Sequence, residues 1–515
     1  MSATRPNLIL VMTDDQAVWS IGAYGHPDPV TPTLDRLAEQ GAFVRWAFAA
    51  EPVCSPSRAS LFSGLWSTEN GLHDVFSMRE YGGLPEAVPF WPSVVREHGW
   101  TTGLIGKWHL GMEPFNHPLE RGFDHFFGFR TGANRPMNPV LQRGDEEPRL
   151  HRGSLPDILT DEAIDFVDAH ADEPFALCLT YRAPHGPHLP VPDEDLAPFR
   201  GRDIEVPMVP PEVAVLDDDL DQPTPETIAF YTEVVRERLR GYYASVHSVD
   251  RNLGRLLAHL DQRGLAGNTI VAFTSDQGYL FGHRGLKAKG NAEPIRMHHV
   301  LDYAPVLNLF DHAVRVPFLV RWPAAIEAGT QVDDLVSLVD VYRTVLGLLG
   351  IPEDEATPRS GRDASPLLRR EQVAWRDTVF AQWNADGMPS GGAHLRMART
   401  HEWKLVHNYL SPSSSRLYHL TEDPEELRNL YYNDDPDPTA FHAWLESDVP
   451  TMPRGGGNWH HLPEYRYHDV KRQLSSRLEA WLRDTGDPIL DLHNRYVESM
   501  LAVRDRWSPA SDEHG

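Results

Sequence analysis

Cysteine is almost absent from this sequence, with only Cys54 and Cys178 among 515 residues. Two cysteines cannot form the set of disulfides that holds small secreted domains together. The fold therefore has to rest on a hydrophobic core, and a chain of this length can bury a large one and divide into more than one domain. Apolar residues make up 41% of the sequence, which is ordinary for a globular protein.

The sequence also lacks a targeting segment and a membrane-spanning segment. The N-terminus reaches the apolar run that begins at Leu8 without a basic region or a cleavage site. No apolar run has the ~20 residues that a helix needs to cross a bilayer. We therefore expect a cytoplasmic protein that does not enter a membrane.

Positive charge is scarce. The chain has 48 Lys and Arg residues against 74 Asp and Glu residues, which gives a net charge of −26. Such an acidic protein is a poor candidate for binding nucleic acid or an anionic membrane surface. Any anion-binding site must therefore be built from local positive charge, against the field of the whole protein.

Short apolar runs of strand length alternate with segments in which apolar residues recur at helical spacing. We expect strands at residues 8–13, 101–105, 175–180, 269–274 and 314–322, and helices at residues 158–171, 226–262 and 338–349. This alternation predicts an α/β fold in which helices cover both faces of a mostly parallel sheet.

The character of the sequence changes around residues 355–375, which are rich in charge and proline. Beyond this segment we expect short strands at residues 378–382, 395–399, 404–406 and 416–419, and a helix at residues 466–483. We therefore predict a large domain over residues 1–365 and a smaller α+β domain over residues 366–515.

Oxygen-bearing side chains follow two of the predicted strands. Asp14 and Asp15 come after the first strand, and Asp276 and Gln277 come after the strand at 269–274. Open α/β sheets bind their ligands at the carboxyl ends of the strands. Hard cations such as Ca²⁺ and Mg²⁺ prefer carboxylate and amide oxygens. One Asp-Asp pair after a strand is more often a cap or a turn, but two pairs at equivalent strand ends favour a metal site.

Cys54 precedes a predicted helix, with Ser55 as a suitable N-cap and Pro56 at the first helical position. The free N–H groups of a helix start favour an anion, and Arg58 adds a permanent positive charge. The residues alone allow a structural buried cysteine or a thiolate nucleophile with a lowered pKa. The spacing from Cys54 to Arg58 is too short for the loop of cysteine phosphatases.

The segment Cys54-Ser55-Pro56-Ser57-Arg58 resembles the C-x-P-S-R signature of type I sulfatases, in the alkaline phosphatase superfamily. The resemblance implies that a formylglycine-generating enzyme oxidises the cysteine to formylglycine, and that the hydrate attacks the sulfur of a sulfate ester. It also implies a catalytic domain over residues 1–365. One divalent metal, Ca²⁺ in preference to Mg²⁺, would be held by Asp14, Asp15, Cys54, Asp276 and Gln277.

Residues 106–111, 184–188 and 281–289 also resemble family motifs, in the family's order. They imply roles in catalysis or sulfate binding for Lys107, His109, His185 and Lys289, with His188 and Lys287 as second choices in their segments. The implied catalytic set is Cys54, Arg58, Lys107, His109, His185 and Lys289. The implied substrate-binding set is Lys107, His185, His188, Lys287 and Lys289.

Two features depart from the family pattern. Gln277 stands where the family usually has Asn or His, and residues 291–311 interrupt the chain after Lys289. We expect this insertion to line the mouth of the pocket and to influence substrate choice. Two alternatives to a sulfatase remain open: a phosphonate monoester or phosphodiester hydrolase on the same scaffold, and a non-catalytic anion-binding protein in which Cys54 is unmodified.

Overall fold

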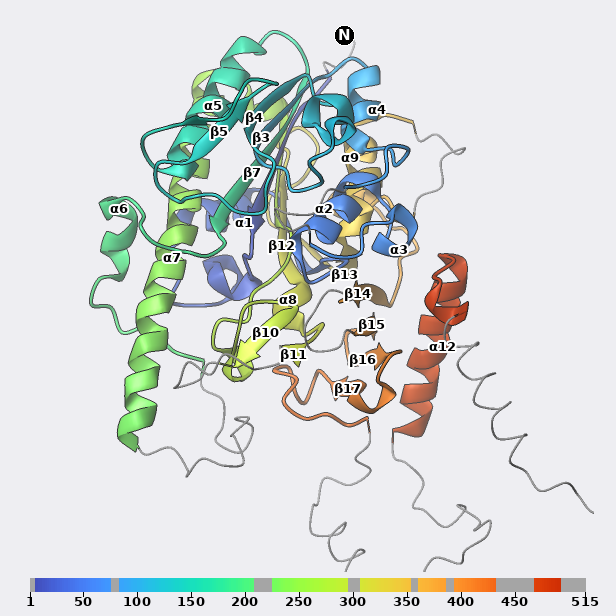
Figure 1. Cartoon of the computed structure of the whole chain (residues 1–515). Helices are drawn as coiled ribbons and strands as arrows, with labels where there is room; N and C mark the ends of the chain where they lie inside the picture. Colours follow the sequence, from blue (N-terminus) through green and yellow to red (C-terminus); the bar gives the residue numbers. More distant parts are fainter. Residues whose placement is uncertain are drawn as a thin grey trace, which may run out of the picture.

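The largest feature of the fold is a ten-stranded sheet (Figure 1). We describe it from a computed structural model, which covers residues 5–75, 83–207, 225–294, 306–352, 360–385, 393–431 and 467–491. In spatial order, the strands are β13 (Thr330–Ser337), β2 (Ala42–Phe48), β12 (Arg315–Arg321), β8 (Thr269–Ser275), β1 (Asn7–Asp14), β7 (Phe175–Pro184), β3 (Thr101–Lys107), β4 (His125–Phe129), β5 (Val140–Arg143) and β6 (Arg149–Leu150).

The centre of this sheet is parallel, as the sequence predicted. Strands β8, β1, β7, β3 and β4 all run in one direction, and β2 and β13 form a second parallel pair. Strand β12 runs antiparallel to both of its neighbours, β2 and β8. The predicted α/β class with a mostly parallel sheet is confirmed.

Helices cover both faces of the sheet, and the alternation of side chains along β1 shows how. Leu8, Leu10 and Met12 face one core cluster, while Ile9 and Val11 face another. The first cluster is completed by α2 (Cys54–Ser63), α4 (Trp91–Glu97) and α9 (Val341–Leu349), and the second by α1 (Pro32–Gln40), α5 (Leu155–Ala169) and α7 (Pro225–Gln262). In Figure 1, α5 and α7 lie across the sheet from α2 and α9.

A smaller antiparallel sheet follows in the C-terminal part of the chain, with strands β14 (Val379–Asn384), β15 (His394–Arg399), β16 (Trp403–Asn408) and β17 (Arg416–His419). Helix α12 (His468–Asp484) packs against this sheet through Leu474, Leu478 and Trp481. The predicted α+β character of this region is confirmed. The boundary at 365/366 stays a prediction. Helix α10 (Ser365–Leu368) lies across it and packs into the core of the large sheet.

The insertion after Lys289 lies partly outside the described residues, which omit 295–305. Its described ends contain β10 (Asn291–Pro294) and β11 (Val306–Leu307), which form a small antiparallel sheet together with β9 (Leu286–Lys287), the strand just before Lys289. Lys289 stands in the connection between β9 and β10. The remaining short α-helices are α3 (Ser67–Asn70), α6 (Asp193–Leu196) and α8 (Asp311–Val314). None of the helices in the described ranges is long and apolar enough to span a membrane.

A buried ion pair joins β15 of the four-stranded C-terminal sheet to the residues just after α12. Arg396 Nε and Nη2 donate to the two carboxylate oxygens of Asp487 at 2.7 and 3.1 Å, and both side chains are at most 1% exposed. We predict that Arg396→Ala lowers the free energy of unfolding by about 3–5 kcal/mol, because it leaves the Asp487 carboxylate buried without its partner.

Urea unfolding of the whole chain, followed by tryptophan fluorescence, measures this loss. The matched control is Arg472→Ala, which breaks a 2.8 Å pair with Asp469 between two exposed side chains. That variant should unfold at nearly the same urea concentration as the parent protein. Equal destabilisation by the two substitutions would contradict the prediction.

Candidate active site

The site is built where β1 and β8 end side by side. The two strands pair in register up to Thr13 opposite Ser275, so the residues that follow them are neighbours. The backbone N–H of Asp15 donates to Asp276 Oδ1 at 3.3 Å. Asp15 has a left-handed backbone conformation, with φ of +67°. Such conformations cost energy in non-glycine residues and tend to occur at functional sites.

Cys54 lies at this edge of the sheet, as the first residue of α2. The predicted N-cap was wrong: the cap position is Val53, which makes no side-chain capping bond, and Ser55 lies inside the first turn. Proline is tolerated throughout the first turn, so Pro56 does not fix the helix start. The helix therefore begins at Cys54 itself, and the cysteine lies at its positive end.

Polar side chains gather around the Cys54 sulfur. We call this set the ring around Cys54, and it consists of Asp14, Asp15, Arg58, Lys107, Asp276, Gln277 and Lys289. Lys289 Nζ is 2.9 Å from Sγ, Gln277 Nε2 is 3.4 Å away, and Sγ donates to Asp14 Oδ1 at 3.4 Å. Burial, followed by the charge of Asp14, raises the pKa of the thiol to about 11. An unmodified Cys54 is therefore a neutral thiol at pH 7, which disfavours the thiolate nucleophile that the sequence left open.

Lys107 and Lys289 both reach the carboxylates at the end of β1. Lys107 Nζ donates to Asp14 Oδ2, and Lys289 Nζ donates to Asp15 Oδ1 at 2.7 Å. Burial alone would raise the pKa of Asp14, but Lys107 and the other surrounding cations hold it well below its usual range. Burial would likewise lower the pKa of Lys289, and Asp15 with its neighbours holds it well above its usual range. Both groups are thus charged at neutral pH.

Arg58 is completely buried and contacts two of the carboxylates. Its Nε donates to Asp276 Oδ2 at 2.8 Å, and its Nη1 donates to the backbone oxygen of Lys107 at 3.0 Å. Its Nη2 lies 3.8 Å from Asp14 Oδ2. The guanidinium therefore joins α2 to the ends of β1, β3 and β8, and its described contacts are with protein groups of the site.

His185 follows β7, and its Nε2 lies 3.8 Å from Asp15 Oδ2 while its Nδ1 contacts the oxygen of Gly186 at 2.8 Å. Burial lowers the pKa of this imidazole, and the charges of Asp14 and Asp15 act in the opposite direction. His188 points elsewhere: its Nδ1 lies 2.6 Å from the oxygen of Pro184, and its ring packs against Tyr242 and Phe281.

His109 is buried two residues beyond Lys107 and has a φ of +63°. Its ring lies so close to Gly132 that a Cβ on that glycine would come within 2.5 Å of Nε2. The segment around His109 is therefore tightly constrained. The catalytic role implied for His109 stays a prediction.

The two candidate lysines after β8 have different surroundings. Lys289 Nζ lies in the ring around Cys54, whereas Lys287 Nζ pairs with Glu293 at 2.9 Å and its side chain is 40% exposed. Asn308 Nδ2 donates to the backbone oxygens of Lys289 and Gly290, each at 2.9 Å. The described end of the insertion thus supports the backbone of Lys289.

The donor set at this edge fits a hard divalent cation. Asp14, Asp15 and Asp276 supply three carboxylates that are at most 2% exposed. Gln277 Nε2 donates to Asp15 Oδ1 at 2.7 Å, while its Oε1 is buried without a hydrogen-bond partner among the described residues. In this orientation Nε2 faces the carboxylates, and turning the amide by 180° would present Oε1 instead, which is the kind of ligand that Ca²⁺ or Mg²⁺ takes.

Sequence reasoning missed several residues that hold the site in place. Tyr242 Oη donates to the backbone oxygen of Asp15 at 2.7 Å, and Ser57 Oγ donates to the backbone oxygen of Asp276. Arg182 is 2% exposed and donates to the carbonyls of Gly186 and Pro187, which fixes the loop after His185. Ser57 belongs to the C-x-P-S-R segment, but that pattern gave it no role of its own. Tyr242 and Arg182 lie in no motif, and all three residues act on backbone oxygens, which carry no sequence signal.

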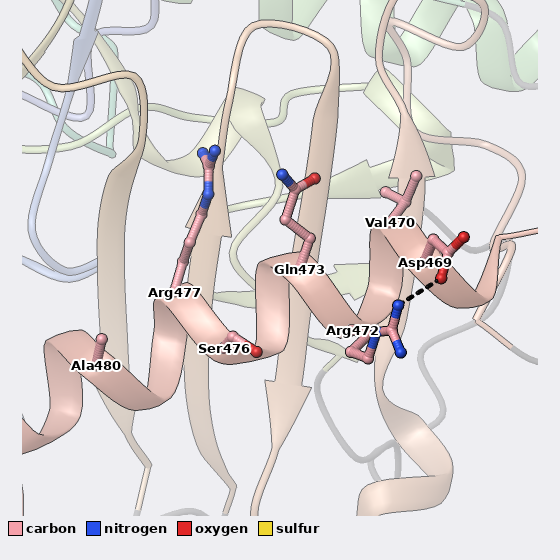
Figure 2. A pocket seen from close by; sticks show the side chains of 7 residues that line it. All are labelled: Asp469, Val470, Arg472, Gln473, Ser476, Arg477 and Ala480. Atoms are coloured by element: carbon pink, nitrogen blue, oxygen red, sulfur yellow. Dashed lines mark hydrogen bonds and ion pairs between the residues drawn. The ribbon is translucent and has the colours of Figure 1, made fainter.

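A separate hollow lies along α12 (Figure 2). All seven side chains drawn there come from this one helix, and the pair marked among them is the exposed Asp469–Arg472 pair. None of these residues belongs to the ring around Cys54. The hollow is thus a feature of the helix surface, apart from the candidate site.

Comparisons with known proteins agree with this geometry. The model of the sulfatase family matches residues 6–351, and a model of the C-terminal region of N-sulphoglucosamine sulphohydrolase matches residues 306–449. N-acetylglucosamine-6-O-sulfatase of Bacteroides thetaiotaomicron is 26% identical over 493 residues, which cover 83% of each chain. Steryl-sulfatase of Mus musculus is 31% identical over 503 residues, which cover 79% of this chain and 71% of the relative.

Solved structures are similar as well. One, a complex with its substrate D-glucosamine-2-N,6-O-disulfate, has a TM-score of 0.74 at 24% identity and covers 94% of this chain and 99% of its own. Another, a complex with k-i-k-neocarrahexaose, has a TM-score of 0.65 at 25% identity and covers 86% and 90%. Since the family model spans more than half of the chain, including every residue of the ring around Cys54, the chain belongs to the sulfatase family of the alkaline phosphatase superfamily and is a sulfuric ester hydrolase.

Proposed function

We propose that this sulfatase removes sulfate from a sulfated carbohydrate, using formylglycine made from Cys54 and one divalent cation. The observation that carries the proposal is the surroundings of the Cys54 sulfur. Burial and the charge of Asp14 disfavour the thiolate, while Lys289 Nζ and Gln277 Nε2 donate towards the same position. A cation on the nearby carboxylates would add the positive charge that stabilises an oxygen nucleophile there.

The carbohydrate substrate is supported by the relatives. N-acetylglucosamine-6-O-sulfatase and N-acetylgalactosamine-6-sulfatase are among them, and one similar structure holds a glucosamine disulfate. The same scaffold could accept another tetrahedral oxyanion, so a substrate panel has to include aryl phosphonates and phosphodiesters. The cytoplasmic location and maturation by a formylglycine-generating enzyme stay predictions from the sequence.

The residues of the site have separate roles in this reaction. Formylglycine, as its hydrate, supplies two hydroxyls on one carbon, one to attack sulfur and one to expel sulfate afterwards. A cation held by Asp14, Asp15, Asp276 and Gln277 would supply the positive charge that polarises the attacking oxygen.

Lys107 and Lys289 stabilise negative charge on the sulfuryl oxygens. Arg58 holds Asp276 and the end of β3 in place and acts as a positioning residue. His185 or Lys289 protonates the leaving oxygen. His109 assists the proton loss that releases sulfate. The influence of residues 291–311 on substrate choice stays a prediction from the sequence, because residues 295–305 lie outside the described residues.

The first prediction concerns Cys54. Protein made beside a formylglycine-generating enzyme should carry an aldehyde at this position, detected by mass spectrometry of the peptide and by a hydrazide probe. Cys54→Ser should give at most one turnover, because a single hydroxyl can accept the sulfuryl group but cannot expel it. Cys178→Ser is the control, since Cys178 is buried in β7 outside the ring, and it should keep multiple turnovers. Multiple turnovers by Cys54→Ser would disprove the proposed chemistry.

The second prediction concerns the cation. Removal of divalent ions with a chelator should abolish turnover of an aryl sulfate, and Ca²⁺ or Mg²⁺ should restore it. Asp276→Ala should lower kcat/KM more than Gln277→Ala, because it removes a charge and leaves Arg58 buried without its partner. Full activity in protein shown by elemental analysis to be free of metal would be decisive against this part of the proposal.

The third prediction separates the two lysines. Lys289→Ala should lower kcat/KM by at least ~100-fold, because it removes a charge next to the reacting oxygen. Lys287→Ala is the matched control two residues away, and it should change kcat/KM less than about twofold because its partner is the surface residue Glu293. If both variants lose activity equally, the assignment of Lys289 is wrong.

A further inference from the structure

A second cluster of metal-binding side chains lies outside the active site. His283, His312 and Glu425 offer ligand atoms that all lie within 4.8 Å of one another. His283 Nδ1 is 3.3 Å from Glu425 Oε2, and His312 Nε2 is 3.7 Å from the same oxygen. Ligands of one tetrahedral Zn²⁺ ion, with Zn–N distances of about 2.0–2.1 Å, are separated by roughly 3.4 Å. The observed separations are close to that value.

The cluster is poorly explained as an ion pair alone. The two imidazole rings stack with their centroids 3.8 Å apart and share one carboxylate oxygen. The 3.7 Å separation leaves His312 Nε2 beyond hydrogen-bond distance of that oxygen. Burial holds the pKa of His312 well below its usual range, whereas the hydrogen bond from His283 lowers that of Glu425 to about 2. A neutral imidazole and an ionised carboxylate are the protonation states that a metal ligand needs.

The three segments that carry these groups are already held together. Arg284 Nη1 donates to the backbone oxygen of Glu425 at 2.8 Å, and its guanidinium lies 4.0 Å from the ring centroid of Phe310. The backbone N–H of Asp311 donates to Glu426 Oε2 at 2.6 Å. These contacts hold the three segments close together, whereas the two stacked rings would have to turn so that one nitrogen of each points at a single ion.

We propose that His283, His312 and Glu425 form a second metal site, for a first-row divalent transition ion such as Zn²⁺. Two imidazoles and one carboxylate favour such an ion over Ca²⁺, which prefers oxygen ligands. The site therefore differs in ligand chemistry from the carboxylate set at the end of β1. Glu425 is 48% exposed, which gives an ion access from solvent.

The bound ion would join three distant parts of the chain: the turn at His283–Gly285, helix α8 and the segment after β17. The turn lies between Gln277 and Lys289, and the backbone N–H of Gly278 donates to the oxygen of Ala313 in α8 at 2.9 Å. The second site would thus stabilise the loop that carries two residues of the active site. Its expected effect is on stability, and it takes no part in the chemistry.

The test measures Zn²⁺ binding to the untagged full-length chain in excess Ca²⁺. Asp14, Cys54 and His185 could also hold one ion, so every protein in the test carries Cys54→Ala. Competition with a chromophoric chelator gives the affinity, and Co²⁺ absorption spectra report the ligand set. We expect one tightly bound equivalent of Zn²⁺ and a higher Tm on its addition.

His283→Gln and Glu425→Gln should each weaken this binding at least about tenfold and remove the rise in Tm. His419→Gln is the matched control, because His419 also pairs with two carboxylates, Glu402 and Glu422, but no second imidazole among the described residues pairs with them. The control should bind Zn²⁺ as the parent does. Circular dichroism establishes that each variant is folded, and Glu425→Gln, at an exposed side chain, provides the test if His283→Gln is not. Absence of tight Zn²⁺ binding in the parent, or unchanged affinity in the folded variants, would overturn the proposal.

Discussion

The structure depends on opposite charges that are buried together at the carboxyl ends of β1 and β8. Asp14, Asp15 and Asp276 are at most 2% exposed, and Arg58, Lys107 and Lys289 are the cations that accompany them. A buried ion without a partner costs several kcal/mol, so each of these groups is tolerable only while the others are in place. The same ion pairs therefore fix α2, the end of β3 and the segment of Lys289 around the Cys54 sulfur, which is the preorganisation that catalysis requires.

The C-terminal sheet contacts the residues that precede Cys54. Glu51, three residues before Cys54, is fully buried and accepts hydrogen bonds from Ser60, the backbone of Ser67 and Gln382 of β14. Burial raises its pKa to about 7 despite these bonds. The backbone N–H of Gly290 also donates to the oxygen of Pro52 at 3.2 Å. The residues before Cys54 thus contact both the four-stranded C-terminal sheet and the segment of Lys289. The C-terminal part of the chain therefore helps to position the site.

The sequence was informative where one local pattern determines the outcome. The apolar runs before Asp14 and Asp276 predicted buried parallel strands, and both strands end beside each other as expected. The reversed direction of β12 was not predictable, because strand direction depends on pairing with distant strands. The helix cap at Ser55 was wrong because proline fits any position of a first turn. Tyr242 was read only as part of a helix, and its bond to Asp15 joins residues more than two hundred positions apart.

The balance of charge explains how so acidic a protein could attract a sulfate ester. Its net charge of −26 repels anions at long range, and salt at physiological concentration screens this field beyond about 8 Å. Within the ring, three carboxylates face three cations, so the protein groups alone have no net charge. A divalent cation bound to those carboxylates would leave an excess of positive charge next to the reacting oxygen. On the proposed function, the cation would thus determine both where a sulfate binds and which oxygen is activated, and the surrounding acidic surface would keep other anions from collecting elsewhere on the molecule.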